Sequence, residues 1–323
     1  MNKRLFLASA ALLAAPCAFA QAAWPTAKPI SIIVPFGAGG SVDSTARLLA
    51  DKLGERLKQS VVVDNVTGAG GTIGLAKGAQ AAPDGYTLVM GADSPVAIAP
   101  YANPKAVRYD VARDLAPIGL VNTAPMVLVA RKDLPANNLA ELVQLAKKEP
   151  GKLSYATSGV GTVLHLAMEL IKQQGQFFAT HVPYRGGAQI AADVIGGQVD
   201  LAMLVSVSAA PFVQSGKLKA IAVTGARRLD ILPGVPAVAE TPGFKGYDVV
   251  AWTGLFAPAK TPAPVVERLN HELNAVLALP EVRATLQKQG AIAGSGSAAD
   301  FGRFVKAEQL RYEKAVKSAG IKE

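Results

Sequence analysis

The sequence predicts an α/β protein built from two doubly wound lobes, and three observations support this prediction. Short β-branched runs alternate with helical stretches along the chain, which is typical of parallel sheets covered by helices. A second series with the same rhythm follows the first. The last helical stretches have no glycine-rich loop of their own, so we expect them to cover the first lobe. The predicted lobes are residues 24–123 with 246–323, and residues 124–245, joined by a hinge that the chain crosses twice, near Thr123 and Lys245.

Residues 1–20 predict a secretory signal peptide. Lys3 and Arg4 precede an apolar run over residues 5–15, and Ala18-Phe19-Ala20 supplies an A-x-A cleavage site. The apolar run is shorter than the roughly 20 residues that cross a bilayer. We therefore expect a periplasmic protein that is cleaved near Ala20.

The cysteine content limits the chemistry that the mature chain could use. Cys17 is the single cysteine, and it could be lipidated, but Pro16 directly before it favours cleavage after Ala20 instead. A mature chain without cysteine has neither disulfides nor thiolate metal ligands.

The formal net charge of +9 does not predict a nucleic-acid-binding protein, because the basic residues are scattered singly or in pairs without aromatic residues between them. The positive field mildly favours anionic ligands. After the leader, no apolar stretch reaches the length that spans a membrane.

The elements of the first lobe follow the hydrophobic pattern. Residues 30–34 predict a buried strand because their β-branched run is continuous. Residues 41–57 predict a helix with Val42, Leu49 and Leu53 on one stripe. A strand at 61–63, a helix at 72–81 and a strand at 86–90 complete a β-α-β-α-β series, which implies a parallel sheet.

The second lobe repeats this order, and the chain then returns. Its predicted strands are 126–130, 153–155, 199–203 and 220–224, and its predicted helices are 139–148, 162–173 and 187–195. Residues 181–183 lead into the last of these helices. A strand at 249–256 and helices at 264–277, 281–289 and 298–318 follow a proline-rich connection.

Two glycine-rich loops are the main candidates for a binding site. They cover residues 34–43 and 156–165, and each follows a strand and opens into a helix. Ligands of open α/β sheets bind beyond the carboxyl ends of the strands, where free N–H groups at a helix start attract anions. Thr162 is a predicted N-cap, and Ser158 adds a hydroxyl. Either loop alone could be a tight turn, but one loop in each lobe predicts a shared cleft.

A dinucleotide-binding enzyme is a less supported alternative. Gly37, Gly39 and Gly40 follow a strand and begin a G-x-G-x-x pattern, and Asp64 ends the next strand. Val42 stands where the last glycine of the pattern belongs, and the predicted secretion separates the protein from cytosolic nicotinamide cofactors.

Catalytic and metal sites are not predicted. No G-x-S-x-G surrounds Ser158, and His165, His181 and His271 fit no metal-ligand spacing. Paired carboxylates placed for acid–base work are not visible in the sequence. We expect no cofactor and no metal, and we keep His165 as a residue that could line the cleft.

An ordered set of segments resembles a known family. One of them is Ala82-Pro83-Asp84-Gly85-Tyr86-Thr87-Leu88. The others are residues 33–43, 68–71, 158–166, 181–184, 196–201, 216–220 and 255–258. Over nearly the whole mature chain, the sequence resembles the Bug-type solute-binding proteins of tripartite tricarboxylate transporters.

The resemblance implies a type II periplasmic-binding-protein fold that closes over a small carboxylate, with the loops at 39–43 and 158–162 holding the carboxylate. It also implies a two-component membrane permease as the partner. We expect a monomer that binds no nucleic acid, and a sensor that feeds a signalling receptor stays the alternative. The candidate ligand-binding residues are Phe36, Gly39, Gly40, Ser41, Asp43, Ser94, Ser158, Gly159, Gly161, Thr162, His165, Tyr184, Asp200 and Leu204.

The chain departs from the family pattern at two places. Pro95-Val96 and Leu204-Val205 stand where many relatives carry polar residues, and we expect all four side chains on the sides of the cleft. The predicted ligand therefore has one carboxylate and an apolar or aromatic remainder. The competing interpretation is that Arg185 pairs with a second carboxylate.

Overall fold

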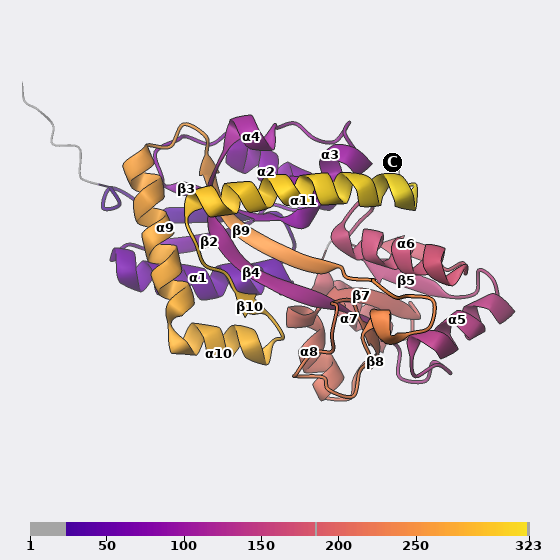
Figure 1. Ribbon diagram of the computed structural model, residues 1–323. Coiled ribbons are helices and arrows are strands. Elements are labelled where there is room, and N and C mark those ends of the chain that lie inside the picture. Colours follow the sequence, from indigo (N-terminus) through magenta and orange to yellow (C-terminus); the bar gives the residue numbers. More distant parts are fainter. Residues whose placement is uncertain (1–23, 185, 322–323) are drawn as a thin grey trace, which may run out of the picture.

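The computed structural model describes residues 24–184 and 186–321 and confirms the α/β class, with two lobes side by side (Figure 1). The predicted signal peptide lies outside the described residues. The strands are β1 (Ile30–Val34), β2 (Val61–Asn65), β3 (Thr87–Ala92), β4 (Leu115–Ala130), β5 (Ser154–Thr157), β6 (Thr180–Pro183), β7 (Leu201–Val205), β8 (Lys219–Val223), β9 (Val250–Pro258) and β10 (Ile292–Ala293).

The α-helices are α1 (Ser41–Leu57), α2 (Thr72–Ala79), α3 (Ala99–Ala102), α4 (Val111–Asp114), α5 (Leu139–Lys148), α6 (Val163–Gly175), α7 (Gly187–Ile195), α8 (Ser206–Gln214), α9 (Ala263–Ala278), α10 (Pro280–Lys288) and α11 (Ala298–Ala319). The shorter helical turns are η1 (Ala69–Gly71), the π-helix η2 (Ser94–Ile98) and η3 (Val238–Glu240).

One twisted sheet runs through both lobes in the order β2-β1-β3-β9-β4-β7-β5-β6. In the first lobe, β1 is parallel to β2 and β3, as the β-α-β-α-β pattern predicts. In the second lobe, β5 is parallel to β6 and β7. The sheet is nevertheless mixed, which corrects the expectation of a parallel sheet, because β4 and β9 run antiparallel to their neighbours.

The long strand β4 connects the lobes. It pairs with β9 from Leu115 to Pro125, and from Met126 onward it pairs with β7 and β8. The pairing partner thus changes between Pro125 and Met126. On the return, the Val249 amide donates to the Thr224 carbonyl just before β9 begins. The exact boundaries of the lobes and their hinge motion stay a prediction.

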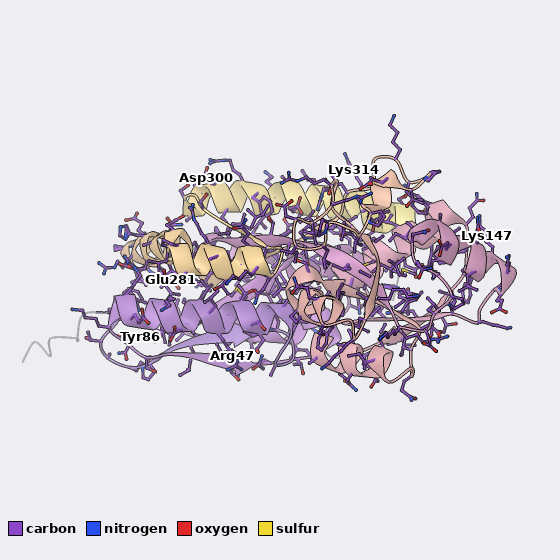
Figure 2. All side chains as sticks on the ribbon, turned by 90° about the horizontal axis from the view of Figure 1, so that it is seen from below. Arg47, Tyr86, Lys147, Glu281, Asp300 and Lys314 are labelled. Carbon is purple, nitrogen blue, oxygen red and sulfur yellow. The ribbon has the colours of Figure 1, made fainter. Side chains whose placement is uncertain are left out.

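The C-terminal helices cover the first lobe, where α11 lies along the sheet over β4 and β9 (Figure 1). Trp252 on β9 packs edge-on against Phe301 and Phe304 of α11, at ring-centroid distances of 6.1 and 5.4 Å. Charged side chains on separate elements, such as Lys147, Glu281 and Lys314, are exposed on the outside (Figure 2). Charged side chains of both signs are therefore spread over the surface.

Candidate ligand-binding site

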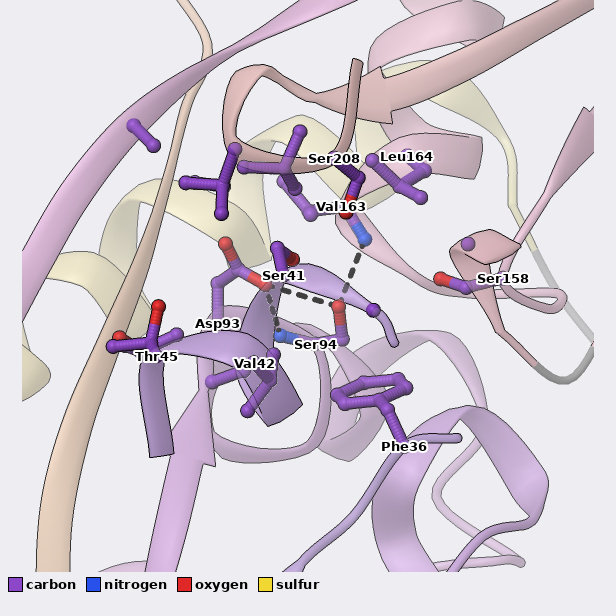
Figure 3. Close-up of a pocket in the computed structure, with 18 of the residues that line it drawn as sticks. Phe36, Ser41, Val42, Thr45, Asp93, Ser94, Ser158, Val163, Leu164 and Ser208 are labelled. Carbon is purple, nitrogen blue, oxygen red and sulfur yellow. Dashed lines mark hydrogen bonds between the residues drawn. The ribbon is translucent and has the colours of Figure 1, made fainter. Parts of the chain in front are cut away.

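A cavity lies between the lobes at the carboxyl ends of β1, β3, β5 and β7 (Figure 3). Its volume is about 60 Å³, enough for several waters or a small ligand, since one water needs about 10–15 Å³ on this scale. It is lined by Phe36, Gly40, Ser41, Val42, Thr45, Ala92, Asp93, Ser94, Asn122, Ala124, Ser158, Val163, Leu164, Gly186, Gly187, Leu204, Val205, Val207, Ser208, Ala251, Trp252 and Thr253.

The first glycine loop is held from behind by Asp43. Its Oδ2 accepts hydrogen bonds from the Gly39 amide at 2.9 Å and from Arg47 at 3.0 Å, while its Oδ1 accepts from Asn65 at 2.9 Å. Burial by itself would raise the pKa of Asp43, but the hydrogen bonds from Arg47, Gly39 and Asn65 together lower it. Asp43 therefore stays ionised and fixes the loop without lining the cavity.

Helix α1 starts at this loop with a glycine as its N-cap. Gly40 has no side chain to accept a hydrogen bond from the first turn, and Ser41 and Val42 follow it into the cavity wall. The first N–H groups of a helix have no intrahelical acceptor. The N-terminus of α1 therefore presents backbone donors to the cavity.

The N-terminus of α6, at the second glycine loop, is already occupied. Thr162 is its N-cap, accepting from the His165 amide and donating to the Gly159 carbonyl at 2.8 Å. The Val163 amide donates to Ser94 Oγ across the cleft at 3.0 Å. Gly159 and Gly161 have φ of 128° and 69°, so their backbone conformations favour glycine.

Helix α7 supplies the second glycine N-cap. Gly186 caps the helix without a side chain, and both Gly186 and Gly187 line the cavity. A Cβ on Gly186 would lie 3.4 Å from Gly37 Cα of the first loop. The starts of α1 and α7 thus approach each other from the two lobes. This part of the site was not predicted from the sequence, because Gly187 was treated only as the first residue of a helix.

A histidine pair lies behind the second glycine loop. The rings of His165 and His181 stack at 4.2 Å, and Tyr155 stacks on His181 at 4.9 Å. Burial lowers the pKa of His165. Burial also lowers the pKa of His181 to about 4, and the neighbouring His165 contributes to that decrease. The Gly161 amide donates to Nδ1 of His165 at 3.2 Å, which requires that nitrogen to be unprotonated.

Ser94 and Asp93 form the floor of the cavity after β3. Ser94 Oγ donates to Asp93 Oδ1 at 3.0 Å (Figure 3). Asp93 Oδ2 accepts from the Trp252 amide at 3.0 Å. Asp93 is 2% exposed. Asp93 was not among the predicted site residues. The sequence feature that could have indicated it is an acidic residue directly after a strand. Among the described residues that line the cavity, Asp93 is the sole ionisable side chain.

The predicted site residues divide into three groups. The cavity wall contains Phe36, Gly40, Ser41, Ser94, Ser158 and Leu204. The residues that shape the loops behind it are Gly39, Asp43, Gly159, Gly161, Thr162 and His165. Tyr184 and Asp200 lie outside the cavity.

Both outside residues have partners of their own. The Tyr184 hydroxyl donates to Asp193 at 2.7 Å. Asp200 precedes β7, at the end opposite the cavity, and accepts from Arg131 and from Ser154. We therefore leave Tyr184 and Asp200 out of the proposed site.

Of the four residues that depart from the family pattern, two line the cavity and two do not. Leu204 and Val205 line the cavity, as expected. Pro95 and Val96 do not: Val96 is fully buried in the core, and the Pro95 carbonyl accepts from Tyr109. They follow Ser94 into η2, which turns them away from the cleft. Arg185 lies outside the described residues.

Within residues 24–184 and 186–321, no group of three or more side chains that could ligate a metal ion occurs. None of the helices in that part of the chain combines the length and apolar character that crossing a bilayer requires.

A family model described as the tripartite tricarboxylate transporter family receptor, TctC, matches residues 45–321. The chain belongs to the TctC family. The resemblance to Bug-type proteins is thereby confirmed: BugT of Bordetella pertussis is 33% identical over 297 residues, covering 92% of this chain and 90% of BugT. A protein from the tcbD-tcbE intergenic region of Pseudomonas sp. strain P51 is 37% identical, covering 90% of this chain and 85% of that protein.

Solved structures of similar proteins agree with the fold. The periplasmic binding protein BugD has a TM-score of 0.87 at 36% identity, covering 91% of this chain and 98% of BugD. An R. palustris protein with adipate has a TM-score of 0.89 at 35% identity, with coverages of 93% and 99%. MatC from Rhodopseudomonas palustris, with bound malate, has a TM-score of 0.85 at 32% identity, with coverages of 90% and 99%. This TctC chain is a solute-binding protein of a periplasmic receptor family.

Proposed function

We propose that this TctC receptor binds one small carboxylate between the N-termini of α1 and α7 and delivers it to a two-component membrane permease. The observation that carries the proposal is the meeting of two glycine-capped helix starts, at Gly40 and Gly186, in one cavity. Free N–H groups and the helix dipole make such a place favourable for an anion. The adipate and malate in the solved relatives support the same ligand class.

The side chains of the cavity suggest how the carboxylate is oriented. Ser41, Ser158 and Ser208 line the cavity and offer hydroxyl donors close to the two helix starts. Much of the remaining wall is apolar and includes Leu204 and Trp252. We infer that the carboxylate lies at the helix starts and that the rest of the ligand packs on the apolar wall. Burying a second carboxylate there would cost several kcal/mol without further donors.

We infer that the protein works by binding and not by catalysis, as an exported monomer without a cofactor or nucleic-acid partner. His165 and His181 are engaged in the loop behind the cavity. Uptake is completed by the permease, which would receive the carboxylate from the closed receptor.

A ligand screen tests the proposal. Binding to the folded state alone raises the melting temperature, so we expect thermal shifts with mono-, di- or aromatic carboxylates and none with uncharged sugars. We expect benzoate or hexanoate to shift the melting temperature more than citrate does. If no carboxylate stabilises the protein, the proposed function is wrong.

Two serine variants locate the contact. Ser158→Ala and Ser208→Ala should each weaken binding of the best carboxylate about tenfold to a hundredfold, because a hydrogen bond to a charged group contributes about 1.5–3 kcal/mol. The matched control is Ser215→Ala, at an exposed serine just after α8, which should not change affinity. Calorimetric titration gives the affinities. Full affinity in both cavity variants would place the carboxylate elsewhere.

A further inference from the structure

Asp93 is an acidic side chain in a cavity that we assign to an anion. It follows β3 at the start of η2 and is 2% exposed. Its Oδ1 accepts from the Ser94 amide at 2.6 Å and from the Ser94 hydroxyl at 3.0 Å, and its Oδ2 accepts from the Trp252 amide. These donors are all neutral. Among the described residues, no cationic side chain forms an ion pair with Asp93 (within 4.0 Å) to balance its negative charge.

The charged groups packed near Asp93 do not replace that missing cation. Helix α11 brings Glu308, Arg311 and Tyr312 to this region. Glu308 pairs with Arg311 at 2.8 Å, and its own charge disfavours ionisation of Asp93. The Tyr312 hydroxyl donates to the Val250 carbonyl.

The nearest ionisable groups on the helices that begin at the cavity are bonded elsewhere. On α1, Asp43 is held by the Gly39 amide and by Arg47. On α6, His165 accepts from the Gly161 amide.

The ionisation state of Asp93 is therefore easily changed. Burial raises the pKa of Asp93 to about 7, although the hydrogen bonds from Trp252 and Ser94 oppose this rise. A carboxylate bound at the starts of α1 and α7 would lie in the same cavity as Asp93. Two like charges at such a place disfavour each other's ionisation.

Resting on the proposed function, we propose that Asp93 is a specificity-determining residue, which takes up a proton when a carboxylate binds and discriminates against ligands that carry a second carboxylate. A monocarboxylate adds one negative charge to the cavity, and protonation of Asp93 removes one. A dicarboxylate adds two, and a single proton on Asp93 cannot offset both. Asp93 therefore makes the cavity selective by charge, in addition to the selectivity of its apolar wall.

The linkage has a defined sign. If binding takes up one proton, affinity falls as pH rises, by up to about tenfold per pH unit above the pKa of the free protein. We expect this slope for hexanoate between pH 7 and 9. The histidines do not contribute in this range, because burial lowers the pKa of both His165 and His181.

Calorimetry on the unmodified protein provides the first test. Hexanoate is titrated at pH 7.5 in two buffers with different heats of ionisation, HEPES and Tris, and the difference gives the number of protons exchanged. With a pKa of about 7, about three quarters of Asp93 is ionised at pH 7.5, so we expect an uptake of up to about 0.7 proton. Clear binding of hexanoate without proton uptake, or with proton release, would overturn the inference, whereas failure of every carboxylate to bind would overturn the proposed function and the inference together.

Variants assign the proton to a residue. Asp93→Asn keeps the size of the side chain and removes its charge, so its affinity for hexanoate should not change with pH. Adipate has the same six-carbon length as hexanoate. At pH 8, the ratio of the affinity for adipate to that for hexanoate should be at least about tenfold higher in Asp93→Asn than in the unmodified protein, because a like-charge repulsion is removed. The control Glu308→Gln removes the neighbouring acid on α11 and should keep the pH slope of the unmodified protein. A slope that persists in Asp93→Asn, or disappears in Glu308→Gln, would assign the proton elsewhere.

Discussion

His181 shows how a residue outside the cavity can control the loop that forms it. Its Nε2 lies 2.6 Å from Thr157 Oγ1, and that hydroxyl also contacts Gly159 of the second glycine loop. Its neutral ring stacks on His165, whose Nδ1 accepts from the Gly161 amide. A proton on either ring would place a positive charge in a buried stack, and a proton on Nδ1 of His165 would also break its hydrogen bond to the loop.

We expect this pair to make the protein less stable in acid. The pKa of His181 is lowered from 6.5 to about 4 in the folded state, so the unfolded chain binds the proton first as pH falls. The stabilisation is complete above pH 6.5 and is lost between about 6.5 and 4, by about 1–2 kcal/mol once screening by solvent is included. Asp93 acts in the opposite direction, because its raised pKa favours the folded state as pH falls from about 7.

Comparison of variants isolates the contribution of His181. The free energy of unfolding is measured by urea titration from pH 4 to 8 for the unmodified protein and for His181→Gln. The difference between the two curves should change with pH in this range. His271→Gln, at an exposed histidine on α9, is the control. Parallel curves for His181→Gln and the unmodified protein would contradict the prediction.

At the scale of the elements, the start of α7 is the feature with the clearest consequence. Gly187 has no positive φ, and a Cβ there would meet Ser208 Oγ at 3.6 Å and Leu204 Cδ2 at 3.8 Å, which are ordinary contacts. An alanine would therefore fit the backbone, while its methyl group would enter the cavity in front of the helix N-terminus.

Gly187→Ala should weaken carboxylate binding at least about tenfold without lowering the melting temperature, because the backbone there has no positive φ and the added methyl group makes only ordinary contacts. The control is Gly234→Ala, at a glycine without positive φ where an added methyl group would have nothing within 4 Å. Calorimetry and thermal denaturation of both variants test this. Unchanged affinity in Gly187→Ala would remove the α7 terminus from the site.

The regular elements were predictable because their hydrophobic pattern matches the surface that they bury. The helices at 139–148 and 187–195 agree with α5 and α7 to the residue. The first half of β4 was missed, since Pro117, Gly119 and Pro125 interrupt its pattern. The structure accommodates Pro117 and Gly119 by a register shift against β9, and Pro125 pairs with Val250 at the end of that ladder. Helix α8 was missed because Pro211 lies inside it and its amphipathic pattern is weak.

The site was only partly predictable, for reasons that also lie in its elements. The loops after β1 and β5 were visible from their glycines. The sequence could not predict that the Val163 amide at the start of α6 already has an acceptor, because that acceptor is Ser94, which is 69 residues away in the chain. Asp200 was included by resemblance, but its ion pair with Arg131 forms at the far end of β7.

At the scale of the whole molecule, the two lobes touch on several sides of the cavity. Ser94 of the first lobe accepts from Val163 of the second, and a Cβ on Gly39 would lie 3.4 Å from Ala188 Cβ. These contacts describe a closed arrangement. These contacts form only when the loops of both lobes lie against each other. In that arrangement both helix starts could contact one bound anion.

We expect the free protein in solution to be more open than this structure and to close when a carboxylate binds, since a ligand that contacts both lobes favours the state in which both contacts exist. Small-angle scattering with and without saturating hexanoate should give a smaller radius of gyration for the complex. Identical profiles at saturation would indicate a cleft that is already closed without ligand.

The position of β9 in the sheet has a consequence for the order in which the molecule can be completed. This strand lies between β3 and β4, yet it follows the entire second lobe in the sequence. A growing chain that has not reached β9 leaves the facing edges of β3 and β4 unpaired, and it also lacks the α11 residues that cover them. The second lobe lies almost entirely in one continuous segment, which is complete before β9 is made. The lobe that begins the chain is therefore the last to be finished during synthesis.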